Sequence, residues 1–189
     1  MSDFYTIASG RPYPYYAELE SSSIPYKFQD ACYNSLFQHI KPDEPMTLMV
    51  TEESEEVYAD FMYVESVPLI SERFRNLLDD FGIDNLLYKK IILKHPSTHN
   101  EYECWLALPP VIDCLDFDKS EFIPIIKAVK KIVIDEKKVG RYDIFKIASE
   151  HARRAASNEI IITEKLHSYL LDVQEKQGFK LESVYMIKL

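Results

Sequence analysis

The order of helical and strand-like patterns along the chain is the strongest constraint on its fold. From residue 70 onward, a helix precedes two pairs of strands, and a further strand, a second helix and a last strand follow. We expect a helix over 71–82, strands over 85–95, 101–108, 128–135, 142–148 and 159–162, a helix from Thr163, and a strand over 182–189. This order lacks the regular strand–helix–strand alternation of a doubly wound parallel sheet. The sequence therefore predicts an α+β fold with mixed or antiparallel sheets and a few short helices.

The helix expected over 71–82 has the clearest local signals. Ser71 is placed to cap the first turn, Glu72 suits the positive end of the helix dipole, and Gly82 can take the left-handed conformation that ends a helix. The apolar stripe consists of Phe74, Leu77, Leu78 and Phe81. This pattern predicts that the stripe faces the core.

The first third of the chain has a different texture. Residues 9–30 are rich in Pro, Ser and Tyr and indicate loop structure, whereas apolar spacing over 33–40 predicts a short helix. Two β-rich runs follow at 46–53 and 57–64, separated by the polar tip 52–56. These runs predict a β-hairpin.

The charge of the chain divides near the same place. Residues 1–69 contain 12 acidic and 3 basic side chains, a net charge of −9, whereas residues 70–189 contain 19 of each. We therefore expect an acidic, Tyr- and Pro-rich N-terminal subdomain, residues 1–69, packed on an α+β domain, residues 70–189. An acidic field repels nucleic acid and anionic membranes and attracts a cationic protein surface. Solubility alone explains such a charge equally well.

Two features indicate the compartment. The chain has no basic segment followed by an apolar run at its start, and no uninterrupted apolar stretch of the roughly 18 residues that a membrane span needs. The cysteines, Cys32, Cys104 and Cys114, are odd in number and widely spaced, which favours reduced, buried thiols over a disulfide framework. We expect a cytoplasmic protein, and the sequence leaves open whether it forms homo-oligomers.

The segment VIDCLDFDKSEF, residues 111–122, resembles a metal or catalytic loop because it holds Asp113, Asp116 and Asp118. A calcium loop that began at Asp116 would need Gly at its sixth position and Glu at its twelfth, where this chain has Glu121 and Lys127. A charged turn is the better interpretation. A hydrolase that uses the three aspartates with a metal ion stays as an alternative.

Other chemical signatures are weak. A zinc set of His95, His99, Cys104 and Cys114 lacks the paired cysteines of structural zinc sites. The chain has only 4 glycines, which leaves no phosphate-binding loop and no nucleophile elbow. We expect neither a cofactor nor enzymatic activity.

Several segments, in their order and spacing, resemble an α+β immunity-protein family of bacterial polymorphic toxin systems. The resemblance covers about residues 65–189. It is carried by a Ser-x-Arg-Phe helix start at 71–74, the Ile-Asp-Cys-Leu-Asp segment at 112–116 with the following Ser120, the Ile-Phe pair at 144–145, and the Gly-Phe ending at 178–179.

The resemblance implies binding rather than catalysis. A member of this family would neutralise a cognate toxin through a tight protein–protein complex. It also implies that the Asp-Cys-Leu-Asp segment is a strand entering a turn, with Ile112 and Leu115 inward and with Asp116 or Ser120 closing the turn through hydrogen bonds to the backbone.

The uneven charge suggests which residues contact such a toxin. Carboxylates would steer a basic toxin surface, and aromatic side chains would slow its release. The steering candidates are Glu52, Glu53, Glu55, Glu56 and Asp60, and the anchor candidates are Tyr13, Tyr15 and Tyr16. An adaptor or regulatory binding module would show the same acidic first third, and it stays as an alternative function.

Overall fold

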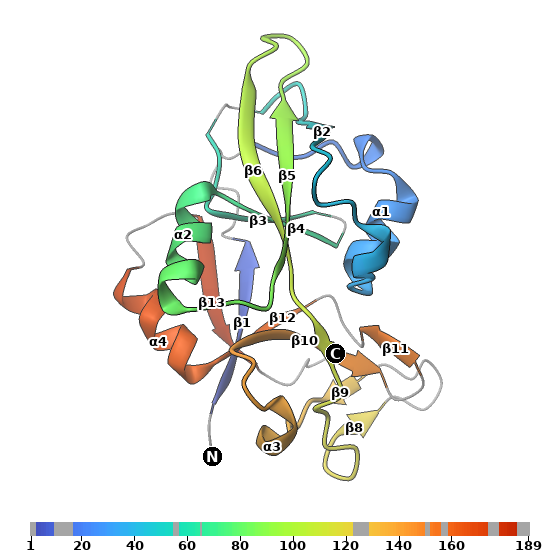
Figure 1. Cartoon of the computed structure of the whole chain (residues 1–189), viewed down its shortest axis with the longest axis vertical. Helices are drawn as coiled ribbons and strands as arrows, with labels where there is room; N and C mark the ends of the chain where they lie inside the picture. Colours follow the sequence, from blue (N-terminus) through green and yellow to red (C-terminus); the bar gives the residue numbers. More distant parts are fainter. Residues whose placement is uncertain are drawn as a thin grey trace.

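The structure, a computed structural model, describes residues 3–9, 17–54, 57–64, 66–122, 129–149, 152–155, 159–173 and 178–184. Two β-sheets lie one above the other in Figure 1, and short helices cover their faces. The predicted α+β class with mixed sheets is confirmed. None of the helices in the described part of the chain is long and apolar enough to cross a membrane.

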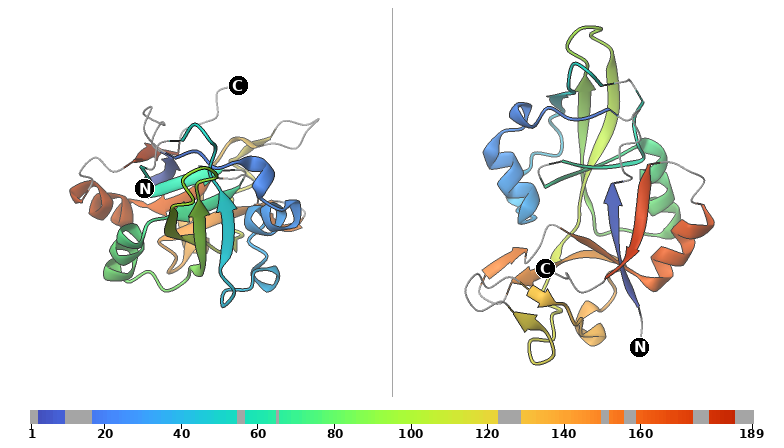
Figure 2. Two further views of the ribbon diagram at one scale, coloured as in Figure 1. Left: turned by 90° about the horizontal axis from the view of Figure 1, so that it is seen from above. Right: turned by 180° about the vertical axis from the view of Figure 1, so that it is seen from behind.

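The upper sheet has five strands. Their order across the sheet is β2 (Met46–Met49), β5 (Leu87–Lys94), β6 (Glu101–Leu108), β4 (Val67–Ile70) and β3 (Phe61–Val64). β2 runs parallel to β5, and the other neighbours are antiparallel. The sheet lies between two helices, α1 (Tyr26–Tyr33) on one side and α2 (Glu72–Phe81) on the other (Figures 1 and 2).

The lower sheet is built around the first strand of the chain. Its order is β11 (Ala152–Ala155), β10 (Ile144–Ser149), β12 (Ile160–Thr163), β1 (Phe4–Ser9) and β13 (Phe179–Ser183), with β7 (Val111–Ile112) parallel to β10. The right panel of Figure 2 shows β1 beside β13, with α4 (Glu164–Asp172) next to them. A small ladder of β8 (Glu121–Phe122) and β9 (Val129–Lys131) and the one-turn helix α3 (Glu136–Val139) complete this end.

The local sequence signals predicted helix α2 correctly. The Ser71 hydroxyl accepts a hydrogen bond from the Phe74 N–H at 3.0 Å, and Gly82 ends the helix at φ 94°. Phe74 and Leu78 are buried, as the predicted stripe requires. The β5–β6 pair and the Thr163 cap of α4 are also confirmed, because in each case the governing residues are close in sequence.

The predicted hairpin of 46–53 with 57–64 is wrong. β2 pairs instead with β5, and β3 pairs antiparallel with β4, the next strand of the chain. Strand β4 contains Pro68, and because proline is rare inside sheets the sequence does not indicate a strand there. β4 contacts β6 only through Leu69 and Ile70, so Pro68 lies outside that ladder.

The predicted helix over 33–40 is also wrong. Helix α1 begins earlier, at Tyr26 directly after Pro25, within a segment expected to be loop. The chain cannot continue it because Ser35 has φ 49°, and only a short 3-10 turn follows at Phe37–His39. The expected C-terminal strand begins earlier than predicted, as β13, and residues 185–189 lie outside the described residues.

Strand pairing crosses the predicted boundary at residue 69. β1 pairs with β12 and β13, β2 pairs with β5, and β4 itself spans the boundary. One apolar cluster joins Leu48 and Val67 to Ile91 and Leu106. Strands from both parts thus belong to common sheets, and the division into 1–69 and 70–189 stays a prediction about folding units.

Two buried lysines also join the parts. The Lys146 ammonium, in β10, donates to the carbonyls of Cys32 at 2.9 Å and Tyr33 at 3.3 Å, which are the last carbonyls of α1. Lys89, in β5, donates to the carbonyls of Lys41 and Glu44 and so holds the turn before β2. Carbonyls at a helix end favour a cation, which explains why a buried ammonium is tolerated there.

The core position of Phe74 gives a first prediction. Its ring is 1% exposed and packs on Phe179 at a centroid distance of 5.0 Å and on Phe61 at 6.2 Å. Phe74→Ala should lower the free energy of unfolding by about 3–5 kcal/mol, measured by urea denaturation. Leu171→Ala, in α4 and 48% exposed, is the control and should change it by less than about 0.5 kcal/mol. Equal stability of the two variants would show that the buried face of α2 is misassigned.

The buried Lys146 gives a prediction in pH. Burial lowers its pKa from 10.5 to about 8, so between these values the unfolded chain binds a proton that the folded protein does not. The contribution of Lys146 to the free energy of unfolding should therefore rise with pH across that window, by at most about 1.4 kcal/mol per pH unit. This contribution should be lost as pH falls through the folded-state pKa.

The measurement is urea unfolding of the wild type and Lys146→Met from about pH 7 to about pH 9.5. The free-energy difference, wild type minus variant, should increase above about pH 8. Lys27→Met, which removes an exposed lysine side chain, is the control for the loss of one positive charge. A flat difference for Lys146→Met would contradict the depressed pKa.

Candidate protein-binding face

Four exposed carboxylates, Glu18, Glu20, Glu52 and Glu53, lie together beside β2, and we call them the acidic rim. The backbone brings their two segments side by side. The Thr51 N–H donates to the Glu18 carbonyl at 2.7 Å, and the Glu20 N–H donates to the Met49 carbonyl at 2.9 Å. The rim therefore forms from residues more than thirty positions apart in sequence.

The side chains around the acidic rim determine how much of its charge a partner would meet. Within the part of the chain that the structure describes, none of its four carboxylates forms an ion pair with Lys, Arg or His. Glu20 accepts a hydrogen bond from the Ser22 hydroxyl at 2.6 Å, and Glu52 accepts one from the Ser97 hydroxyl. Both donors are neutral, so these hydrogen bonds do not offset the charge of the rim.

Apolar side chains lie directly beside the acidic rim. Ala17 donates its N–H to the carbonyl of Val57, whose side chain is 46% exposed. The next residue, Tyr58, stacks on Tyr102 with ring centroids 4.0 Å apart. Burial, with Cys104 next in effect, raises the pKa of Tyr102 to about 12, so its hydroxyl stays neutral at physiological pH. This face combines negative charge with an apolar patch.

The five predicted steering carboxylates do not share one environment. Glu52 and Glu53 are exposed in the acidic rim, whereas Glu55 and Glu56 lie outside the described residues. Asp60 is only 6% exposed; it accepts a hydrogen bond from the Ser71 hydroxyl at 2.5 Å and lies 3.3 Å from the Arg73 guanidinium. A buried carboxylate next to its own cation exerts little field outside the protein, so we leave Asp60 out of the contact face.

The three predicted aromatic anchors, Tyr13, Tyr15 and Tyr16, lie outside the described residues. Sequence reasoning missed Glu18 and Glu20. The signal that could have found them is the alternation Ala17-Glu18-Leu19-Glu20, in which Ala17 and Leu19 are buried and the two glutamates are exposed. Leu19 forms a β-bridge with Val50, as that alternation would suggest.

The aspartates of residues 111–122 belong to a charged turn. Asp116 accepts hydrogen bonds from the N–H and the ammonium of Lys119, at 3.2 and 2.7 Å, and these bonds lower its pKa. Ser120 accepts one from the Val133 N–H at 3.0 Å. Asp113 and Asp118 are exposed. The predicted turn closure by Asp116 and Ser120 is thus confirmed, as is the inward direction of Leu115, which is fully buried.

Three of the four residues considered for zinc are buried in the structure: His95, Cys104 and Cys114. His95 is buried, and its Nδ1 accepts hydrogen bonds from the backbone N–H groups of Ser97 and Thr98, which fixes the β5–β6 turn. Cys104 and Cys114 are buried and free, and burial raises the pKa of both thiols. In the described residues no three His, Cys, Asp or Glu side chains lie close enough together to hold a metal ion.

Two shallow cavities lie at the lower sheet. One, of about 510 Å³, lies between α3 and the start of α4. It is lined by Asp143, which accepts a hydrogen bond from the Thr163 hydroxyl at 2.6 Å. The other, of about 400 Å³, lies against β13 beside Glu159 and Glu182. Burial, with Glu182 next in effect, raises the pKa of Glu159. The Thr163 hydroxyl also accepts a hydrogen bond from the Leu166 N–H at 3.4 Å, so this residue caps α4.

The turn of residues 116–120 gives a prediction that separates structure from catalysis. Asp118→Asn should change the free energy of unfolding by less than about 0.5 kcal/mol, because the side chain is exposed. Ser120→Ala should cost about 1 kcal/mol or more, because the Val133 N–H loses its acceptor. Both values come from urea unfolding. If Asp118→Asn abolished protection while folding and toxin binding persisted, the aspartates would be catalytic after all.

The profile of an immunity protein family, Imm11, matches residues 8–186 of the chain. The match includes the first part of the chain, which the sequence resemblance at about 65–189 did not cover. None of the curated proteins compared with the chain matches it. Because the family match covers nearly the whole length, the chain belongs to the immunity protein family Imm11.

Proposed function

We propose that this protein neutralises a cognate bacterial toxin by forming a tight, non-catalytic complex with it in the cytoplasm. Membership of an immunity protein family supports the role of a toxin-binding protein. The single observation that carries the mechanism is the acidic rim, whose four exposed carboxylates pair with no cation among the described residues. A toxin with a basic surface is the partner that this charge would attract.

Speed of capture is the first requirement on such a complex. An immunity protein has to meet its toxin before the toxin acts, and opposite charges raise the rate of encounter. The acidic rim is exposed on neighbouring segments, so its four charges act on the same approaching surface.

Slow release is the second requirement, and apolar anchors provide it. Val57 and the stacked Tyr58 lie beside the rim. Glu55 and Glu56 lie between the rim and Val57 in sequence, and Tyr13, Tyr15 and Tyr16 directly precede Ala17. We propose that these residues extend the same contact face.

The alternatives are less well supported. A hydrolase based on Asp113, Asp116 and Asp118 has no support from the turn that holds them, where Asp116 is paired with Lys119. An adaptor module would share the acidic rim, but the family match favours immunity. Co-purification with the product of a neighbouring toxin gene would distinguish immunity from an adaptor role.

The acidic rim gives a kinetic prediction. Replacing Glu18, Glu20, Glu52 and Glu53 by Gln should slow association with the toxin by about tenfold or more at low salt, because steering is lost. Dissociation should change much less. At about 0.15 M salt, where the screening length is about 8 Å, most of the difference should disappear. Stopped-flow kinetics at two salt concentrations measure both effects.

The matched control changes four exposed carboxylates elsewhere: Asp80, Asp84, Asp118 and Asp172 to Asn. This variant carries the same net charge as the four-Gln variant, so a general charge effect would slow both equally. We expect the control to associate at nearly the wild-type rate. Equal rates for the two variants would assign the rim to solubility and move the contact face elsewhere.

A further inference from the structure

One face of the β5–β6 hairpin is only partly covered by the apolar cores. Along β5 the residues of this face alternate with the buried Lys89, Ile91 and Leu93, and along β6 they alternate with the buried Cys104 and Leu106. We call it the hairpin face, and it consists of Tyr88, Lys90, Ile92, Lys94, Glu101, Glu103 and Trp105. All seven side chains are partly or fully exposed.

An ordered aromatic cluster lies at the lower end of the hairpin face. The Arg75 guanidinium, from α2, lies 4.1 Å from the ring centroid of Trp105 and 4.9 Å from that of Tyr88. The Trp105 indole N–H donates to the Glu72 carboxylate. Trp, Tyr and Arg are the residues that most often dominate binding energy, and here their conformations are already held in the free protein.

The acidic and basic side chains of this face and of α2 beside it differ in their exposure to solvent. Two ion pairs lie on this face and two lie on α2 beside it, and in all four the carboxylate is more exposed than the cation. The side-chain exposures are 27% and 59% for Arg75 and Glu72, 27% and 44% for Arg75 and Asp79, 35% and 66% for Lys90 and Glu103, and 36% and 55% for Lys94 and Glu101. A partner that approaches the hairpin face therefore meets negative charge first, although acids and bases nearly balance in number.

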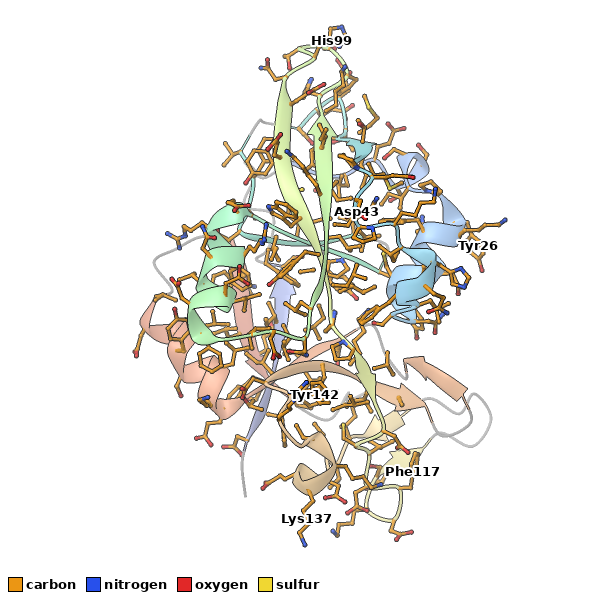
Figure 3. The ribbon with its side chains drawn as sticks, in the orientation of Figure 1. Tyr26, Asp43, His99, Phe117, Lys137 and Tyr142 are labelled. Carbon is orange, nitrogen blue, oxygen red and sulfur yellow. The ribbon has the colours of Figure 1, made fainter. Side chains whose placement is uncertain are left out.

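The turn of the β5–β6 hairpin connects the hairpin face with the acidic rim. The Ser97 hydroxyl, in this turn, donates to Glu52 of the rim. His99, labelled in Figure 3, marks the end of the molecule at which the turn lies. The turn thus brings Glu52 to the end of the hairpin at which Lys94 and Glu101 lie.

We propose that the hairpin face, centred on Trp105, is the part of the contact surface that holds the toxin, and that a cationic toxin surface covers it. This inference rests on the proposed function and adds where the complex is held once the acidic rim has attracted the partner. Lys or Arg side chains of the toxin would pair with Glu101 and Glu103, while Trp105 supplies desolvated contact area.

The test uses the full-length protein and the inactivated toxin domain encoded by a neighbouring gene. Trp105 is the only tryptophan of the chain, so labelling this protein with 5-fluorotryptophan gives a single ¹⁹F resonance that no toxin residue can obscure. We expect that resonance to shift when the complex forms. A saturated complex with an unshifted resonance would overturn the proposal.

Affinity provides the second arm. The double variant Glu101→Gln, Glu103→Gln should raise Kd by about tenfold or more, because it leaves Lys90 and Lys94 facing a cationic partner. Both sites are exposed, so folding should be unaffected. Trp105→Phe should also weaken binding about tenfold, mainly through faster dissociation. Tyr26→Ala is the control: this residue is 80% exposed on α1, on the other side of the sheet, and its loss should leave Kd unchanged.

The outcomes separate the two proposals. Wild-type affinity in the double Gln variant and in Trp105→Phe, with the toxin still bound, would overturn the hairpin face but leave the immunity function intact. Absence of any complex between the wild-type protein and the toxin would remove the proposed function and this surface together. Loss of affinity in Tyr26→Ala alone would place the contact on α1 instead.

Discussion

The bond between Lys146 and the last carbonyls of α1 is the interaction on which the rest of the architecture depends. It crosses from the lower sheet to the helix that covers the upper sheet, and Lys146 is fully buried. An ammonium without acceptors would cost several kcal/mol at this position, whereas hydrogen bonds to a charged group recover about 1.5–3 kcal/mol each. The helix end therefore has to lie above β10, and the two sheets keep a fixed relation.

Several other cationic side chains are also buried or only partly exposed. Lys89 is buried under the turn before β2, and Arg75, Lys90 and Lys94 are less exposed than the carboxylates with which they pair. On this side of the molecule the negative charges are therefore more exposed than the positive ones, whereas Arg73, Lys119 and Lys165 elsewhere are more exposed than their partner carboxylates. A net charge of −9 understates how acidic this side of the molecule looks to a partner.

Sequence reasoning succeeded where the controlling residues are neighbours. Ser71, Phe74 and Gly82 define α2 within twelve positions, and β5 and β6 meet across a short turn. It failed where pairing partners are distant, as for β2 with β5, or where a proline or a positive φ overrides the pattern, as at Pro68 and Ser35. The binding face shows both cases. Glu52 and Glu53 stood out by local charge, but Glu18 and Glu20 join them only through tertiary contacts, and the layering of ion pairs is invisible in composition.

The position of β1 also has a consequence for synthesis on the ribosome. This strand, residues 4–9, lies between β12 and β13, which begin more than 150 positions later in the chain. Pairings between strands so far apart in sequence form late and slowly. The lower sheet can therefore be completed only after β13 has left the ribosome exit tunnel. Until then a nascent chain presents β1 without either of its neighbouring strands in the sheet.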